Sequence, residues 1–187
     1  INGALNSVES KTGSYYSGIA NSIVGTANRT ANSNGSLIFG AGNEITNSVT
    51  SINNAPTDGG NSAKELSEKL RSAVKNSNGG GSTMAFGSGN KADYTLRSAL
   101  MGVNNTLTGS QGNASTNTML TGFHNTADKV SNTTVIGSEN TVTNSKNSLV
   151  MGDNREVKDA NHAVLIGSTD SKTTTSVNNA VAVGHNT

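Results

Sequence analysis

The sequence predicts an all-β protein, a parallel β-solenoid or β-roll whose coils are about 15 residues long. A run of apolar residues followed by glycine recurs along the chain, and most intervals between these glycines are 15 residues. Apolar residues make up 32% of the chain and aromatic residues 3%, which is below the usual share for a compact globule. Only one stretch of the 187 residues has the apolar periodicity of a helix.

The first strand of each coil is expected at the apolar run, which fills three successive positions. Neighbouring residues of a strand point to opposite faces, so this pattern predicts a strand that is covered on both faces. One face should line the interior of the roll and the other a contact with further copies of the chain. The residues assigned to these two faces are Ile23, Val24, Leu37, Ile38, Phe39, Met84, Phe86, Leu100, Met101, Leu120, Val135, Ile136, Leu149, Val150, Met151, Val164, Leu165, Ile166, Val181 and Val183.

The corner after this strand is expected at the repeat glycine, which permits a sharp turn or a close backbone approach. These glycines are Gly18, Gly25, Gly40, Gly87, Gly102, Gly122, Gly137, Gly152, Gly167 and Gly184. Three positions later an asparagine recurs, which we expect to adopt the left-handed conformation and to hydrogen-bond along the stack. These asparagines are Asn28, Asn43, Asn90, Asn105, Asn125 and Asn140.

A second, weaker strand is expected after the asparagine, where single apolar residues stand between polar ones. Its apolar positions are Ile45, Ala92, Leu107, Ala127, Val142 and Val157. This alternation predicts a strand with one buried face and one face in water. No other part of the chain offers a cover for the outer apolar face of the first strand, so self-association is the expected cover.

The helical pattern lies inside an insertion at 52–82, in "SAKELSEKLRSAV" (62–74). Its apolar residues, Ala63, Leu66, Leu70, Ala73 and Val74, fall on one helical face. The Ser-x-x-Glu sequence at its start forms a capping box, and the glycines at 79–81 should end the helix. We expect the apolar face to dock on the roll or on other copies of the chain.

The repeat resembles the head repeats of trimeric autotransporter adhesins, the YadA-like heads. The segments "NNAVAVGHNT" (178–187), "NSLVMGDN" (147–154) and "NTTVIGSEN" (132–140) carry the resemblance best. It implies a left-handed parallel β-roll that forms a homotrimer, with residues 1–187 as one head domain of a longer chain. It also implies the cell surface of a Gram-negative bacterium, with anchoring in the outer membrane through a C-terminal part of that chain.

Catalysis, cofactors, metals and nucleic acid are not expected. Net charge is +1, without the clustered Lys and Arg that nucleic-acid binding requires, and there is no cysteine. His124, His162 and His185 stand at different positions of the repeat, so they do not stack into a metal site. The carboxylates are also scattered over different repeat positions, and no pairing of a nucleophile with a base is found.

Adhesion is the predicted function. The resemblance implies attachment to a host surface receptor, for example one of the carcinoembryonic-antigen-related class, or to an extracellular matrix protein. The candidate receptor-binding residues lie in the insertion and in the lengthened segment at 107–117: Leu66, Leu70, Val74, Leu107 and Gln111. A structural spacer is the first alternative. An ice-binding solenoid is the second alternative. We disfavour it because we find no Thr-x-Thr sequence that recurs at the same position of the repeat.

Overall fold

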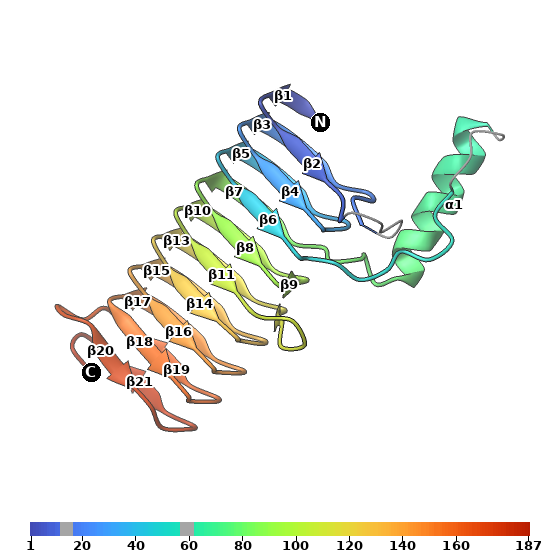
Figure 1. Cartoon of the computed structure of the whole chain (residues 1–187). Coiled ribbons are helices and arrows are strands. Elements are labelled where there is room, and N and C mark those ends of the chain that lie inside the picture. The colour runs from blue at the N-terminus through green and yellow to red at the C-terminus, as the bar shows by residue number, and fades with distance from the viewer. Residues whose placement is uncertain (12–16, 57–61) are drawn as a thin grey trace.

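The computed structural model describes residues 1–11, 17–56 and 62–187, in which the strands alternate between two all-parallel sheets (Figure 1). Sheet A contains β1 (Asn2–Ala4), β3 (Ser22–Thr26), β5 (Leu37–Ala41), β7 (Met84–Ser88), β10 (Ala99–Val103), β13 (Met119–Phe123), β15 (Thr134–Ser138), β17 (Leu149–Asp153), β19 (Val164–Ile166) and β21 (Val181–Val183). Sheet B contains β2 (Ser7–Glu9), β4 (Arg29–Ala31), β6 (Glu44–Thr46), β8 (Lys91–Asp93), β11 (Thr106–Thr108), β14 (Thr126–Asp128), β16 (Thr141–Thr143), β18 (Arg155–Lys158) and β20 (Thr173–Thr175). The predicted solenoid-like fold is confirmed. We number the coils 1 to 10 by their strands in sheet A.

The register of sheet A corrects the start of the repeat. Each strand pairs in parallel with the next so that repeat glycines stand side by side, and Gly25 pairs with Gly3 on one side and Gly40 on the other. Gly18 was predicted to be the first repeat glycine, and this is wrong, because Gly3 holds that place. Gly40 pairs directly with Gly87, so the long interval between them is one coil with an insertion.

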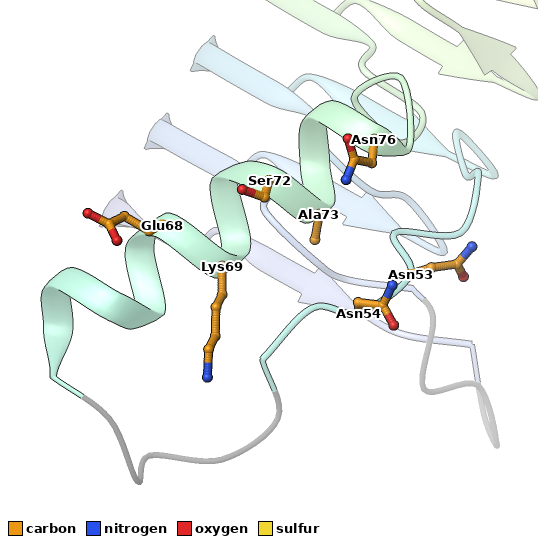
Figure 2. A pocket seen from close by; sticks show the side chains of 7 residues that line it. All are labelled: Asn53, Asn54, Glu68, Lys69, Ser72, Ala73 and Asn76. Atoms are coloured by element: carbon orange, nitrogen blue, oxygen red, sulfur yellow. The ribbon is translucent and has the colours of Figure 1, made fainter.

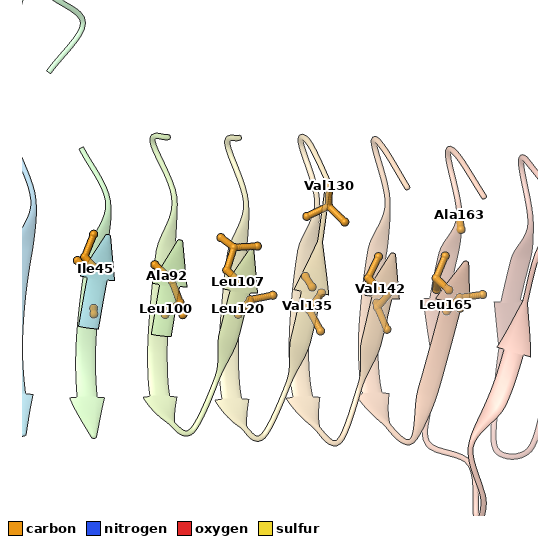
Figure 3. Packing of buried hydrophobic residues seen from close by; sticks show 14 of the residues in the cluster. Ile45, Ala92, Leu100, Leu107, Leu120, Val130, Val135, Val142, Ala163 and Leu165 are labelled. Carbon is orange, nitrogen blue, oxygen red and sulfur yellow. The ribbon is translucent and has the colours of Figure 1, made fainter. Parts of the chain in front are cut away.

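The interior of the roll is filled by the middle residue of each apolar run. Strand alternation turns that residue inward and its two neighbours outward, and Val150 is fully buried while Met151 is exposed. Sheet B contributes the predicted inward residues between polar neighbours. Figure 3 shows the two rows meeting between the sheets, and the cluster includes Ile23, Ile38, Ile45, Ala92, Leu100, Leu107, Leu120, Val135, Val142, Val150, Val157 and Leu165.

The repeat glycines allow neighbouring coils to stack closely at the corner. At Gly137, φ is +130°, and a Cβ atom would lie 1.8 Å from the carbonyl oxygen of Gly152 in the next coil. Both the backbone angle and the contact therefore exclude a side chain at this place. The predicted close backbone approach is confirmed.

The asparagines three positions after the glycine form a buried ladder. Asn140 Nδ2 donates to Asn125 Oδ1 at 3.0 Å, and it also donates to the Gly152 carbonyl oxygen at 2.6 Å. The same side-chain contact links Asn28 to Asn6 and continues through Asn43, Asn90, Asn105 and Asn125.

The left-handed conformation predicted for these asparagines is wrong, because the positive φ falls one residue earlier. Glu139, for example, has φ 59°, whereas the ladder asparagines are absent from the positive-φ residues of the described chain. The repeat selects asparagine here for its side-chain amide, which satisfies buried backbone groups of two coils.

Three of the four lengthened coils carry their extra residues at the same corner, directly after a strand of sheet B; the fourth, coil 9, is two residues longer than the regular repeat. The register changes between Glu9 and Gly18 in coil 1, between Ser48 and Thr83 in coil 3, and within 109–114 in coil 5. Beyond this corner, β9 (Thr95–Leu96) and β12 (Ser115–Thr116) form a short third sheet.

The insertion in coil 3 contains α1 (Ala63–Asn76), the only helix of the residues that the structure describes. Ser62 caps it, and its hydroxyl and the Glu65 carboxylate form the predicted capping box. Figure 1 shows α1 projecting from the corner of the roll, not lying along a sheet.

Candidate functional site

The outer face of sheet A is a largely apolar surface from coil 2 to coil 10. The residue before each repeat glycine points outward, and in coils 2 to 10 this column is apolar except at Thr121. Phe39 is 57% exposed and Met101 42% exposed. The exposed large apolar side chains of this face are Phe39, Met84, Met101, Val103, Phe123, Met151, Ile166, Val181 and Val183. A surface of this extent on a folded chain indicates an interaction surface.

The outer face of sheet B is polar and changes in character along the stack. In coils 2 to 4 it carries charged residues, whereas β11 and β16 each present Thr-x-Thr at one repeat position with Thr126 between them. The expectation that Thr-x-Thr does not recur at one repeat position is therefore wrong. The ranks span only coils 5 to 7, and Asp128 interrupts one of them, so they do not form a long uniform face.

A cavity of about 470 Å³ lies at the corner beside sheet B and is lined by residues from coils 1 to 5. Its lining includes Lys11, Asn32, Asn47, Tyr94 and Gln111, and we call it the corner cleft. Asn32 and Asn47 also line two adjoining cavities of about 370 Å³ each, one over the charged residues of sheet B and one under the loop at 109–114. The hydrophobic core separates the corner cleft from the apolar face of sheet A.

An ion-pair network forms the charged part of this surface. Arg29 donates to the Glu9 carboxylate from Nε at 2.9 Å and from Nη2 at 2.8 Å, and to Glu44 from Nη1 at 2.6 Å. The hydrogen bond from Arg29 lowers the pKa of Glu9 from 4.5 to about 2, and the Glu9 carboxylate in turn raises the pKa of Arg29. The network joins three successive coils.

The predicted receptor-binding residues fall in three different environments. Leu107 is fully buried in the core, so its assignment to receptor binding is wrong. Its apolar side chain is needed inside sheet B. Gln111 is exposed and lines the corner cleft, and Leu66, Leu70 and Val74 are partly buried on α1. Sequence reasoning missed Asn32, Asn47 and Tyr94, although Tyr94 departs visibly from the asparagine at that repeat position.

A separate cavity, of about 340 Å³, lies against α1. Figure 2 shows its lining, in which Ala73 points from α1 toward the segment that carries Asn53 and Asn54. Ala73 is buried, so the end of the helix that is nearer the roll packs on that segment. The lining also contains Glu68 and Lys69 from the exposed side of the helix.

Arg155 replaces asparagine in the ladder and is fully buried. Its backbone N–H donates to Asn140 Oδ1 at 3.0 Å, and its guanidinium donates to the carbonyl oxygens of Gly167 at 2.7 Å and Gly184 at 3.1 Å, and to that of Thr187. One long side chain thereby satisfies carbonyl groups of the last coils, where the ladder ends. We assign Arg155 a structural role.

Within residues 1–11, 17–56 and 62–187, no group of three or more His, Cys, Asp or Glu is arranged to hold a metal ion. His124 contacts Glu139 at 2.9 Å and His185 contacts Asp170 at 3.3 Å, both at exposed positions. In the same ranges, no helix has the length and apolar content that crossing a membrane requires.

Comparisons with protein-family models, curated proteins and solved structures give no match to this chain. The fold therefore assigns the chain to parallel β-solenoid-like proteins, without a family.

Proposed function

We propose that this chain is the head of a bacterial surface adhesin and acts as a homotrimer on the cell surface. The apolar outer face of sheet A is the observation that carries the proposal, because water is an unfavourable neighbour for it along nine coils. Three copies that join through this face bury it and leave the polar corner with its insertions exposed. The sequence resemblance described above supports three copies, the left-handed coil and the Gram-negative outer membrane.

Recognition is placed at the irregular corner because the regular faces repeat the same groups from coil to coil. Specific binding sites usually stand on irregular loops over a rigid scaffold, and here three insertions share one corner. A host surface receptor or an extracellular matrix protein is the proposed partner. The spacer alternative assigns binding to another part of the parent chain.

Two substitutions at adjacent positions test the trimer. Met151→Asp places a charge on the outer face of sheet A and should give a folded monomer, whereas Val150→Asp places it in the core and should unfold the roll. Light scattering measures the mass and circular dichroism the strand content. Thr143→Asp, on the outer face of sheet B, is the control and should remain trimeric. A parent chain that is a stable monomer contradicts the trimer.

Attachment is tested by replacing residues 53–80 with a short Gly-Ser link. This removes α1 but keeps Ile52 and Thr83, both of which are buried. The variant should remain a folded trimer and lose most of its binding to host cells in a flow-cytometry assay. If the parent chain itself binds no host cells, the spacer alternative replaces adhesion. If the variant binds like the parent chain, the insertion is not the receptor site.

A further inference from the structure

We propose that the corner cleft binds a neutral oligosaccharide, with Tyr94 as the stacking platform and Asn32, Asn47 and Gln111 as hydrogen-bonding groups. The inference rests on the proposed adhesive function and names the chemical class that the irregular corner recognises. The corner cleft lies beside sheet B and is separate from the apolar outer face of sheet A.

The cleft is an open hollow on an otherwise repetitive surface. Coil 1 contributes Ser10 and Lys11 at one end, and coil 5 contributes Gln111 from its inserted loop at the other. With coils spaced about 4.8 Å apart, these ends stand about 19 Å apart along the stack. This span suits a chain of several sugar units better than one small molecule. The insertions build walls while the unmodified coils 2 and 4 form the floor.

The charges of the cleft and its adjoining cavities balance and are largely paired. Three carboxylates and three cationic side chains contribute: Glu9, Glu44, Asp93, Lys11, Arg29 and Lys91. Arg29 is held between two of the carboxylates, and Lys91 lies 3.9 Å from one of them. A polyanion or a strongly basic peptide finds no excess of opposite charge here. Neutral hydroxyl groups instead match a surface rich in amide and carboxylate groups.

Hydrogen-bonding capacity remains open toward the cleft. Asn32 Nδ2 donates to Asn47 Oδ1 at 2.9 Å, and Asn47 Nδ2 donates to Asp93 Oδ1 at 2.8 Å. This row fixes the orientation of both amides. Among the described residues, no donor reaches Asn32 Oδ1 in the corner cleft or Asp93 Oδ2 in the adjoining cavity, and the Tyr94 hydroxyl has no partner. Fixed acceptors beside a free phenol are suited to the vicinal hydroxyl groups of a sugar.

Tyr94 stands in a conformation that favours asparagine. Its φ is 52°, and the same repeat position is held by Asn32, Asn47 and Asn144 with φ between 48° and 51°. A bulky side chain in this region costs roughly 1–2 kcal/mol relative to an ordinary backbone conformation. The strained tyrosine is partly exposed and lines the corner cleft with Val49, and both residues also line the adjoining cavity, together with Leu96. An aromatic ring with aliphatic neighbours offers an apolar platform for the face of a sugar ring.

The decisive variant is Tyr94→Asn, which restores the usual residue of this position. It should raise the melting temperature because the backbone strain is relieved, and it should weaken saccharide binding roughly tenfold or more because the platform is lost. Lys129→Asn is the matched control, since Lys129 has φ 53° at the same repeat position outside the cleft. It should leave binding unchanged. Gln111→Ala should weaken binding without lowering the melting temperature.

The measurement is binding of the chain to immobilised lactose, N-acetyllactosamine and their fucosylated forms, with sialyllactose as the acidic counterpart. Saturation-transfer NMR on the best free probe should place the Tyr94 ring at the sugar. The proposal is overturned if no neutral probe binds, if only the acidic probe binds, or if Tyr94→Asn binds like the parent chain.

Attachment assays on host cells then test the saccharide proposal separately from the proposal of adhesion. Glycosidase treatment of the cells should remove attachment, and protease treatment distinguishes glycoprotein from glycolipid carriers. Attachment that survives glycan removal but not protease indicates a protein ligand and overturns the saccharide proposal while adhesion stands. If the chain binds saccharide but attaches to no host cells, the saccharide proposal stands and adhesion to host cells is contradicted.

Discussion

The first five coils and the three that follow them have the same stacked frame but differ in what they add to it. Coils 6 to 8 repeat at 15 residues, and their strands pair without interruption from Met119 to Ile166. Coils 1, 3 and 5 carry extra residues at one corner, yet the glycine pairs and the asparagine ladder continue through them. Insertions are therefore tolerated where the chain leaves sheet B, because neither the glycine pairs nor the buried asparagine ladder runs through that corner.

The interiors of the two regions also differ. In coil 2, Thr30, Ser33 and Ser36 are buried, and their hydroxyl oxygens have no hydrogen-bond partner. In coils 6 to 8 the place of Thr30 is taken by Ala127, Val142 and Val157, all buried. The place of Ser33 is taken by Val130 in coil 6, by Ala160 in coil 8 and by Ser145 in coil 7, where the hydroxyl donates to the Thr143 carbonyl oxygen at 2.8 Å. Unsatisfied buried hydroxyls cost stability, so the regular coils are expected to hold the stack together. The irregular coils supply the cleft and α1.

Substitution of one glycine in each region should give the largest difference in the loss of stability. Gly137→Ala forces a Cβ against the Gly152 carbonyl at φ +130° and should destabilise the roll by roughly 3–5 kcal/mol. Gly112→Ala, in the inserted loop of coil 5, has φ +80° and no neighbouring heavy atom within 4 Å. It should cost only about 1 kcal/mol.

Thermal and denaturant unfolding, followed by circular dichroism, measure both glycine variants against the parent chain. Equal losses for the two would mean that the loop at 109–114 is as tightly constrained as the stack. The regular coils 6 to 8 could then no longer be distinguished from coils 1 to 5 as the part that stabilises the roll.

The stacked strands and their core could be predicted from the sequence. The residues that the corners of the coils bring together could not. Spacing was sufficient for the strands, the helix and the buried apolar rows, because the middle residue of each run must face inward in any stacked coil. The first coil was misplaced because Gly18 has an asparagine three positions later, Asn21, and lies near Gly25. Gly3 has Asn6 at the same distance, and neither Gly3 nor Gly18 is preceded by the apolar run. Leu107 was assigned to binding because its neighbours are irregular, although strand alternation places it inside.

The corner cleft could not be predicted because its residues come from five coils. Asn32 and Gln111 are far apart in the sequence, and only the insertion register brings them to one corner. Tyr94 was the one local signal, since an aromatic residue replaces asparagine at a left-handed position. The outer apolar face was predicted, whereas the trimer that would cover it stays a prediction.

A reciprocal exchange of valine and threonine sharpens the comparison of the two interiors. Thr30→Val removes a buried hydroxyl without a partner and should stabilise the chain by about 1 kcal/mol. Val142→Thr introduces such a hydroxyl in the regular coils and should destabilise by roughly 1–3 kcal/mol. Denaturant midpoints at constant slope measure both changes. No gain from Thr30→Val would indicate that an ordered water satisfies the threonine, and the interiors would then be equally stable.

The smallest expected effect is a response to acid that is confined to the irregular end. The pKa of Glu9 falls from 4.5 to about 2 because Arg29 donates hydrogen bonds to its carboxylate. Since the folded pKa lies below the unfolded one, this contribution to stability is fully present above about pH 4.5 and is lost as the pH falls through about 2. Both side chains are partly exposed, so the loss should be modest and weakened by salt.

Carboxyl-carbon NMR should therefore find Glu9 titrating near pH 2, and amide exchange in β2 and β4 should accelerate over the same range. Arg29→Gln should return the pKa of Glu9 toward 4.5, and Glu9→Gln should remove the acid response of these strands while β15 and β17 exchange as before. Titration of Glu9 near 4.5 in the parent chain would mean that the ion pair does not persist in solution. The first coils would then be joined to the roll by strand pairing, core packing and asparagine hydrogen bonds without the ion pair, and the salt dependence expected for them should also be absent.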